Sequence, residues 1–100
     1  MLLERELQAK VVKSWKKQGA VCTKNDPPVN APVGFPDITC YKPDGTVFMA
    51  EFKRTENSRY QPLQKEWHDK LKMMGFAVYV IHNNNYKKYI DLDNCYNKEV

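Results

Sequence analysis

The chain has 100 residues, of which 42% are hydrophobic and 28% are charged. That length allows one domain with a single modest core, placed over residues 1–100, and the composition is ordinary for a soluble globular protein. No apolar run reaches transmembrane length, so we expect no membrane partner. The net charge of +4 fits either a basic solvated surface or an anionic polymer as partner.

Three cysteines, Cys22, Cys40 and Cys95, are scattered without a C-x-x-C pair. Such a set favours a reducing compartment, with buried or incidental thiols, over a disulfide framework or a zinc site. The first residues, MLLEREL, set acids beside the leucines and do not resemble a signal peptide. We therefore expect an intracellular protein.

Residues 3–18 are predicted to form an amphipathic helix that ends at Gly19. Its apolar side chains recur every fourth residue, namely Leu3, Leu7, Val11 and Trp15. The opposite side is rich in lysine. Glu4 and Glu6 lie in the first turn, where acidic side chains usually stabilise a helix by interacting with its dipole.

A short apolar strand is predicted over residues 20–24, ending at Lys24, which is either a strand-end charge or a phosphate contact. Residues 25–35 contain three prolines and a glycine and are predicted to be a loop. This loop is longer than most in a compact domain. It fits either a functional or partner contact or a mobile linker.

A β-hairpin is predicted over residues 34–53, because the turn sequence KPDG at 42–45 separates two apolar runs. If the two residues that flank this turn are paired with each other, Asp37 faces Glu51 at the open end of the hairpin. Lys53 lies two residues beyond Glu51, on the same face. Opposed Cβ atoms lie about 4.5–5.5 Å apart, where like charges are unfavourable. A proton or a hard divalent cation with oxygen ligands would settle that conflict.

A second helix is predicted over residues 61–74, with Pro62 in its first turn. Its apolar stripe consists of Leu63, Trp67, Leu71 and Met74. We expect Trp67 in the core. Gln64 flanks the stripe, where its amide either positions a water or a phosphate oxygen or is an ordinary surface group. We expect His68 at the surface or facing a partner.

The run FAVYVI at 76–81 is typical of a central strand buried on both faces. The helix before it would cross over onto the sheet. A turn is predicted after it, and residues 86–100 are aromatic and rich in lysine. The tyrosines of this last segment, Tyr86, Tyr89 and Tyr96, would stack on bases, close a dimer or cover a sheet edge.

Pro36 and Asp37, the hairpin, and the run Glu51-Phe52-Lys53 together resemble the PD-(D/E)xK pattern of nucleases. The fuller set is similar to the VRR-NUC (virus-type replication-repair nuclease) domains, in particular to stand-alone viral or phage members. Those domains carry G-x-P-D, here at 34–37, and E-x-K, here at 51–53. They also carry Gln after Pro on the following helix, here at 62–64, and a Glu on the first helix. Glu4 is the best match for that Glu, and Glu6 competes with it.

The resemblance implies an α/β, restriction-endonuclease-like core of helix, strand, β-hairpin, helix and strand, with a mixed sheet flanked by helices. It implies a Mg²⁺- or Mn²⁺-dependent deoxyribonuclease that hydrolyses phosphodiester bonds and needs no organic cofactor. The metal ligands it implies are Asp37, Glu51, the backbone carbonyl of Phe52 and, as a further candidate, Glu4. Lys53 would orient or deprotonate a water and stabilise negative charge. Glu4 and Gln64 would act at the edge of the site, through a second metal or through waters.

Resemblance to stand-alone viral members also suggests branched DNA as substrate, including four-way (Holliday) junctions, a role in DNA repair and the cytoplasm of a host cell. One metal site cuts one strand, so paired cuts in a junction favour a homodimer. Three alternatives stay open. They are a catalytically silent DNA-binding module, a structural dimer whose hairpin acids are merely solvated, and a small subunit of a larger nuclease or repair assembly.

Overall fold

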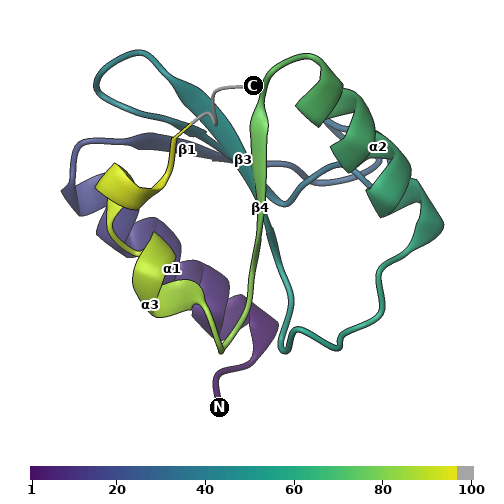
Figure 1. Ribbon diagram of the computed structural model, residues 1–100, viewed down its shortest axis with the longest axis horizontal. Helices are drawn as coiled ribbons and strands as arrows, with labels where there is room; N and C mark the ends of the chain where they lie inside the picture. The colour runs from purple at the N-terminus through teal and green to yellow at the C-terminus, as the bar shows by residue number, and fades with distance from the viewer. Residues whose placement is uncertain (97–100) are drawn as a thin grey trace.

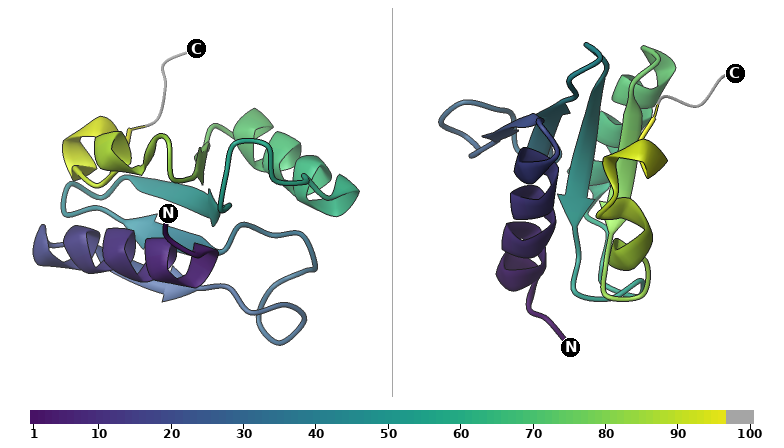
Figure 2. Two further views of the ribbon diagram at one scale, coloured as in Figure 1. Left: turned by 90° about the horizontal axis from the view of Figure 1, so that it is seen from below. Right: turned by 90° about the vertical axis from the view of Figure 1, so that its left-hand side faces the viewer.

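A four-stranded sheet in the order β1-β2-β3-β4 runs through the middle of the molecule, and helices cover both of its faces (Figures 1 and 2). The computed structural model describes residues 1–96, so the last four residues of the predicted domain, 97–100, lie outside the described residues. The elements in chain order are α1 (Glu4–Lys17), β1 (Val21–Lys24), β2 (Ile38–Tyr41), β3 (Val47–Phe52), α2 (Pro62–Met73), β4 (Ala77–Ile81), α3 (Tyr86–Tyr89) and the 3₁₀ helix η1 (Leu92–Asn94).

The sheet is mixed, as predicted. β1 pairs antiparallel with β2 and β2 with β3, whereas β4 pairs parallel with β3 after the crossover through α2. The predicted hairpin register is confirmed, because Thr39 pairs with Met49 and Tyr41 with Val47. No helix within residues 1–96 is long and apolar enough to cross a bilayer.

One face of the sheet packs against α1 and α3, which lie together on the same side in Figure 1. Three residues of the predicted stripe of α1, namely Leu7, Val11 and Trp15, are fully buried, whereas Leu3 precedes the helix and is exposed. The Trp15 ring meets Phe48 edge-on at 5.0 Å between centroids, and its indole N–H donates to the Tyr89 carbonyl at 2.8 Å. This bond ties the C-terminal segment to the first helix.

The C-terminal tyrosines divide into two groups. Tyr86 and Tyr89 are partly buried against the core, and the Tyr89 ring lies 4.8 Å from that of Tyr79 on β4. Both rings therefore pack on the face of the sheet that α1 and α3 cover, beside β4, which is an edge strand rather than the predicted central one. Tyr96 remains exposed.

The other face of the sheet packs against α2, and here the prediction of the apolar stripe was wrong. Only Leu71 of that stripe is buried, whereas Leu63 is 47% and Met74 69% exposed. Trp67 is not in the core, because its half-buried ring covers Phe35 of the long loop at 5.6 Å. The first turns of α2 lie over the polar end of β3, so polar side chains of the helix face the sheet there. His68 is one of them and is buried, contrary to the expected surface position.

Residues 25–35 form no helix or strand, as predicted, and the loop is fixed at both ends. The Asn25 side chain donates to the Pro36 carbonyl at 2.9 Å and to the Thr39 hydroxyl at 3.0 Å. The three cysteines are free thiols, with Cys40 and Cys95 buried, as expected.

Candidate functional site

The two acids of the hairpin meet where the ladder between β2 and β3 ends. Asp37 directly precedes β2, and Glu51 lies near the end of β3. The Asp37 carboxylate accepts a hydrogen bond from the Phe52 backbone N–H at 2.8 Å. The Asp37 side chain therefore satisfies a backbone N–H where the pairing of β2 with β3 stops. The same hydrogen bond orients the Asp37 carboxylate toward Glu51.

Gly34 holds the loop beside α2 and so sets the place of Asp37. Its φ is +93°, which favours glycine, and a Cβ there would lie 2.6 Å from the backbone carbon of Leu63. Only a residue without a side chain fits between the loop and the start of the helix. The glycine of the G-x-P-D motif thus has a packing reason in this fold.

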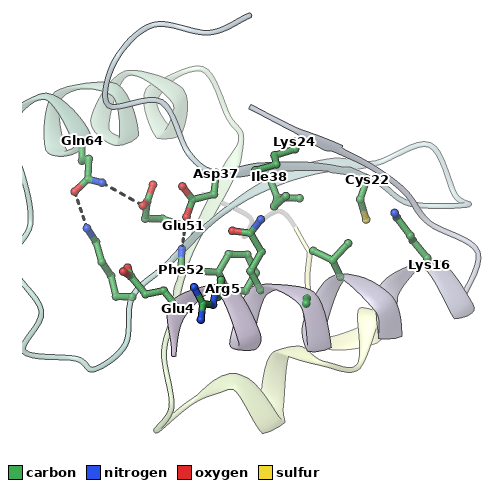
Figure 3. A pocket seen from close by; sticks show the side chains of 14 residues that line it. Glu4, Arg5, Lys16, Cys22, Lys24, Asp37, Ile38, Glu51, Phe52 and Gln64 are labelled. Atoms are coloured by element: carbon green, nitrogen blue, oxygen red, sulfur yellow. Dashed lines mark hydrogen bonds between the residues drawn. The ribbon is translucent and has the colours of Figure 1, made fainter. Parts of the chain in front are cut away.

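The side-chain amide of Gln64 joins the carboxylate of Glu51 on β3 to the ammonium group of Lys53, which directly follows that strand. Gln64 Nε2 donates to Glu51 Oε2 at 3.1 Å, and Lys53 Nζ donates to Gln64 Oε1 at 2.8 Å (dashed lines in Figure 3). Lys53 Nζ also donates to the Arg59 carbonyl at 3.3 Å. Both Glu51 and Lys53 are more than nine-tenths buried. Gln64 therefore lies between two charged groups.

The protonation of the two acids reflects their burial. Burial first, and then the charge of Glu51, raise the pKa of Asp37 to about 7. Burial likewise raises the pKa of Glu51 to about 7, although Asp37 and Lys53 both lower it. Each carboxylate is thus costly in its charged form, and either a proton or a cation relieves that cost.

His68 and Tyr60 complete the buried surroundings of Glu51. His68 is 1% exposed, and its Nε2 lies 3.7 Å from Glu51 Oε1. Its Nδ1 is hydrogen-bonded to the Tyr60 hydroxyl. Burial lowers the pKa of His68 to about 4, so the ring is neutral near pH 7. Sequence reasoning missed this residue, although its spacing of four from Gln64 places both on one face of α2.

The two candidate acids of α1 have different positions. Glu4 lines the same pocket as Asp37 and Glu51, and its charge raises the pKa of Glu51 (Figure 3). Glu6 instead accepts the Leu3 backbone N–H at 2.9 Å and caps the helix. Of the two, Glu4 is the one that faces the site.

The pocket extends from the acids along α1 and encloses about 750 Å³. Asp37, Glu51 and Gln64 lie toward one end and Lys16 toward the other, while Lys24 lies between them beside Ile38 (Figure 3). Its remaining lining includes Arg5, Gln8, Cys22 and Lys53. An anionic chain could therefore lie against positive charge on its way to the carboxylates.

The residues present fit a divalent cation that takes oxygen ligands. Within residues 1–96 no cluster of three or more His, Cys, Asp or Glu side chains could hold a metal by itself. However, Mg²⁺ is usually held by one or two carboxylates, with waters and substrate phosphates as its other ligands. Asp37 and Glu51 supply two carboxylates, and Glu51 Oε1 is buried without a hydrogen-bond partner among the described residues. The backbone carbonyl of Phe52 directly follows Glu51 in the sequence.

No protein-family model and no curated protein sequence matches the chain. Two of the solved structures that share its fold are described as follows. One, described as "VRR_NUC domain", has a TM-score of 0.76 and 24% identity, covering 87% of this chain and 92% of its own. The other, "VRR_NUC domain protein", has a TM-score of 0.67 and 21% identity, covering 87% of this chain and 83% of its own. The fold that the sequence motifs implied is therefore confirmed.

Proposed function

We propose that this protein is a metal-dependent deoxyribonuclease that hydrolyses phosphodiester bonds within DNA. The observation that carries the proposal is the position of the half-buried Asp37 beside the buried Glu51 and Lys53, in a pocket that is also lined by basic residues. A pair of adjacent carboxylates with raised pKa values marks a site that takes a cation or handles protons. The name of the two solved structures that share the fold agrees with nuclease chemistry.

Asp37, Glu51 and the backbone carbonyl of Phe52 would hold Mg²⁺ or Mn²⁺. When bound, such an ion polarises a phosphoryl oxygen and lowers the pKa of water. Glu4, on the opposite side of the same pocket, would contribute through a second ion or through waters. Gln64 binds both Glu51 and Lys53, so it would keep the carboxylate and the ammonium at a fixed separation.

Lys53 would orient the attacking water and stabilise the negative charge that develops on the phosphate. Its ammonium group has three N–H donors, and the structure assigns two of them, to Gln64 and to the Arg59 carbonyl. The third donor is free to point into the pocket. A cation fixed in a buried site stabilises a transition state far better than one in water.

The substrate would lie along α1, with its phosphates near Arg5, Lys16 and Lys24. A single metal site cuts one strand, and two-fold symmetry would supply two sites for paired cuts. We therefore propose a homodimer that prefers branched DNA, such as a four-way junction, as in DNA repair. The exposed apolar residues of the long loop, Val29 and Val33, offer an interface outside the core.

A cleavage assay tests the proposal directly. The wild-type protein would be incubated with linear duplex and four-way junction DNA in Mg²⁺, Mn²⁺ or EDTA, beside Glu51→Ala. We expect metal-dependent cleavage by the wild type, faster on the junction, and none by the variant. Binding without cleavage would instead favour a silent DNA-binding module, and the absence of both would favour a structural dimer. Activity that appears only with added partner proteins would favour a subunit of a larger assembly.

A further inference from the structure

Two buried polar atoms near the site face each other without a partner. They are Glu51 Oε1 and His68 Nε2, separated by 3.7 Å, and they are the only two such side-chain atoms within residues 1–96. Buried polar groups normally find a hydrogen bond, because leaving one unsatisfied destabilises the fold. The separation is too long for a hydrogen bond, but bonds in substrate-free sites often shorten when the site is loaded.

The hydrogen bond at Nδ1 of His68 determines which of the two ring nitrogens carries the proton. A neutral imidazole carries one N–H donor and one acceptor. If the Tyr60 hydroxyl donates to Nδ1, the ring proton must lie on Nε2, facing Glu51 Oε1. The opposite tautomer would direct a lone pair at an ionised carboxylate, which is repulsive.

We propose that His68 is a positioning residue whose Nε2–H, fixed by Tyr60, donates to Oε1 of the ionised Glu51 carboxylate. The inference rests on the proposed function, in which Glu51 is ionised and holds a metal. Gln64 already holds Oε2, so the two oxygens of Glu51 are bound from two successive turns of α2. Each carboxylate oxygen has two lone pairs, and one on each remains for a cation.

The loop before α2 links this arrangement to Lys53. The carbonyl of Arg59 accepts from Lys53, and the next residue, Tyr60, binds His68. One short piece of backbone therefore places both the ammonium and the histidine beside the acid. Groups that orient metal ligands in this way typically change metal affinity 10- to 100-fold when removed.

Metal affinity is the first measurement, made by titration calorimetry with Mn²⁺ in the absence of DNA. We expect His68→Leu, which keeps the bulk and removes both nitrogens, to weaken Mn²⁺ binding about 10- to 100-fold. His68→Gln retains an N–H donor near the position of Nε2, so it should restore most of that loss. His82→Gln, at the other histidine of the chain, is the matched control and should bind like the wild type. Equal affinity in His68→Leu and the wild type would overturn the proposal.

The tautomer is the second measurement, and it does not depend on the leucine variant folding. A long-range ¹H–¹⁵N spectrum of the Ca²⁺-loaded protein at pH 8 should show His68 protonated on Nε2. Tyr60→Phe should lose that preference, whereas Tyr41→Phe, at an exposed position on β2, should keep it. A proton on Nδ1 in the wild type would refute the assignment.

Mn²⁺ binding and DNA cleavage, measured side by side, separate this inference from the proposed function. A wild type that binds Mn²⁺ and cuts DNA, with His68→Leu unchanged in both, refutes the inference alone. A wild type that neither binds Mn²⁺ nor cuts DNA refutes the proposed function, and the inference is refuted with it.

Discussion

Lys53 and Gln64 are joined by a hydrogen bond of 2.8 Å between the ammonium nitrogen and the amide oxygen. The nitrogen of the same amide binds Glu51, and its oxygen also accepts the backbone N–H of Gln61. The Gln64 side chain thus holds the Glu51 carboxylate, the Lys53 ammonium group and the start of α2 in place. A surface glutamine would have none of these partners.

Gln64→Ala should therefore impair the site more than it impairs the fold. We expect a fall of about 10- to 100-fold in the cleavage rate, the usual effect of removing a group that orients a site. Gln61→Ala, whose exposed side chain contacts neither Glu51 nor Lys53, is the matched control. A cleavage rate within a factor of two of wild type would show that the amide does not organise the site.

The metal-free protein should lose stability as the pH rises from about 4 to about 7. The pKa values of Asp37 and Glu51 are raised in the folded state to about 7, and these two groups outweigh the lowered pKa of His68. The folded chain therefore binds more protons than the unfolded chain in this window. Stability then falls with increasing pH and is lowest above pH 7. Urea denaturation at pH 5.5 and pH 8 in EDTA measures the difference. Asp37→Asn should reduce it and should be at least as stable as wild type at pH 8, while being unable to cleave DNA.

Lys53→Ala should separate turnover from metal binding. The proposed role of the ammonium is to stabilise charge in the transition state, so we expect the rate to fall by about 10²- to 10³-fold. Mn²⁺ affinity should stay the same or rise, because the variant has no positive charge next to the metal site. If calorimetry instead shows that metal binding collapses, Lys53 maintains the shape of the site and the assigned role is wrong.

DNA binding should weaken steeply with salt. With Ca²⁺ in place of Mg²⁺ to block cleavage, each neutralised phosphate contributes a slope of about −0.9 in a plot of log affinity against log salt. Replacing both Lys16 and Lys24 with alanine should make the slope shallower by about 1 for each phosphate that is no longer neutralised. Lys65→Ala, whose ammonium pairs with Asp69 on the exposed side of α2, should leave the slope unchanged. A slope near zero for the wild type would exclude a phosphate-binding groove.

The protein should be a dimer at concentrations of tens of micromolar, about where an interface of standard size is saturated. Light scattering coupled to size exclusion measures the mass, and 11.7 kDa is the mass of one chain. Val29→Asp together with Val33→Asp, in the long loop, should shift the protein toward the monomer. A monomeric wild type would remove the reason to expect paired cuts without affecting the metal chemistry.

The hairpin could be predicted from the sequence because its register depends on local turn chemistry. The turn places Gly45 at a φ of +87°, and Lys42 donates its backbone N–H to the Thr46 carbonyl at 2.8 Å. Once those two residues pair, the position of Asp37 opposite Glu51 follows from the period of two. The buried stripe of α1 could likewise be predicted, because its apolar side chains recur every fourth residue.

The inner face of α2 could not be predicted from hydrophobic spacing. Leu63 and Trp67 follow the helical period, yet Gln64 and His68 are the side chains that face β3 at its polar end. Periodicity assumes an apolar partner surface, and a buried polar site violates that assumption. For Glu4 and Glu6, the sequence could not show which one caps α1, because both lie in its first turn.

The hairpin that carries the two acids also bears on how the chain folds. Asp37, Glu51 and Lys53 all belong to this single local unit, whereas Glu4, Gln64 and His68 come from helices that pack against it. Hairpins form within about 1–10 μs, before distant contacts are made. The repulsion between the two acids is therefore present while the hairpin nucleates, and a divalent cation that relieves it should speed folding as well as stabilise the native state.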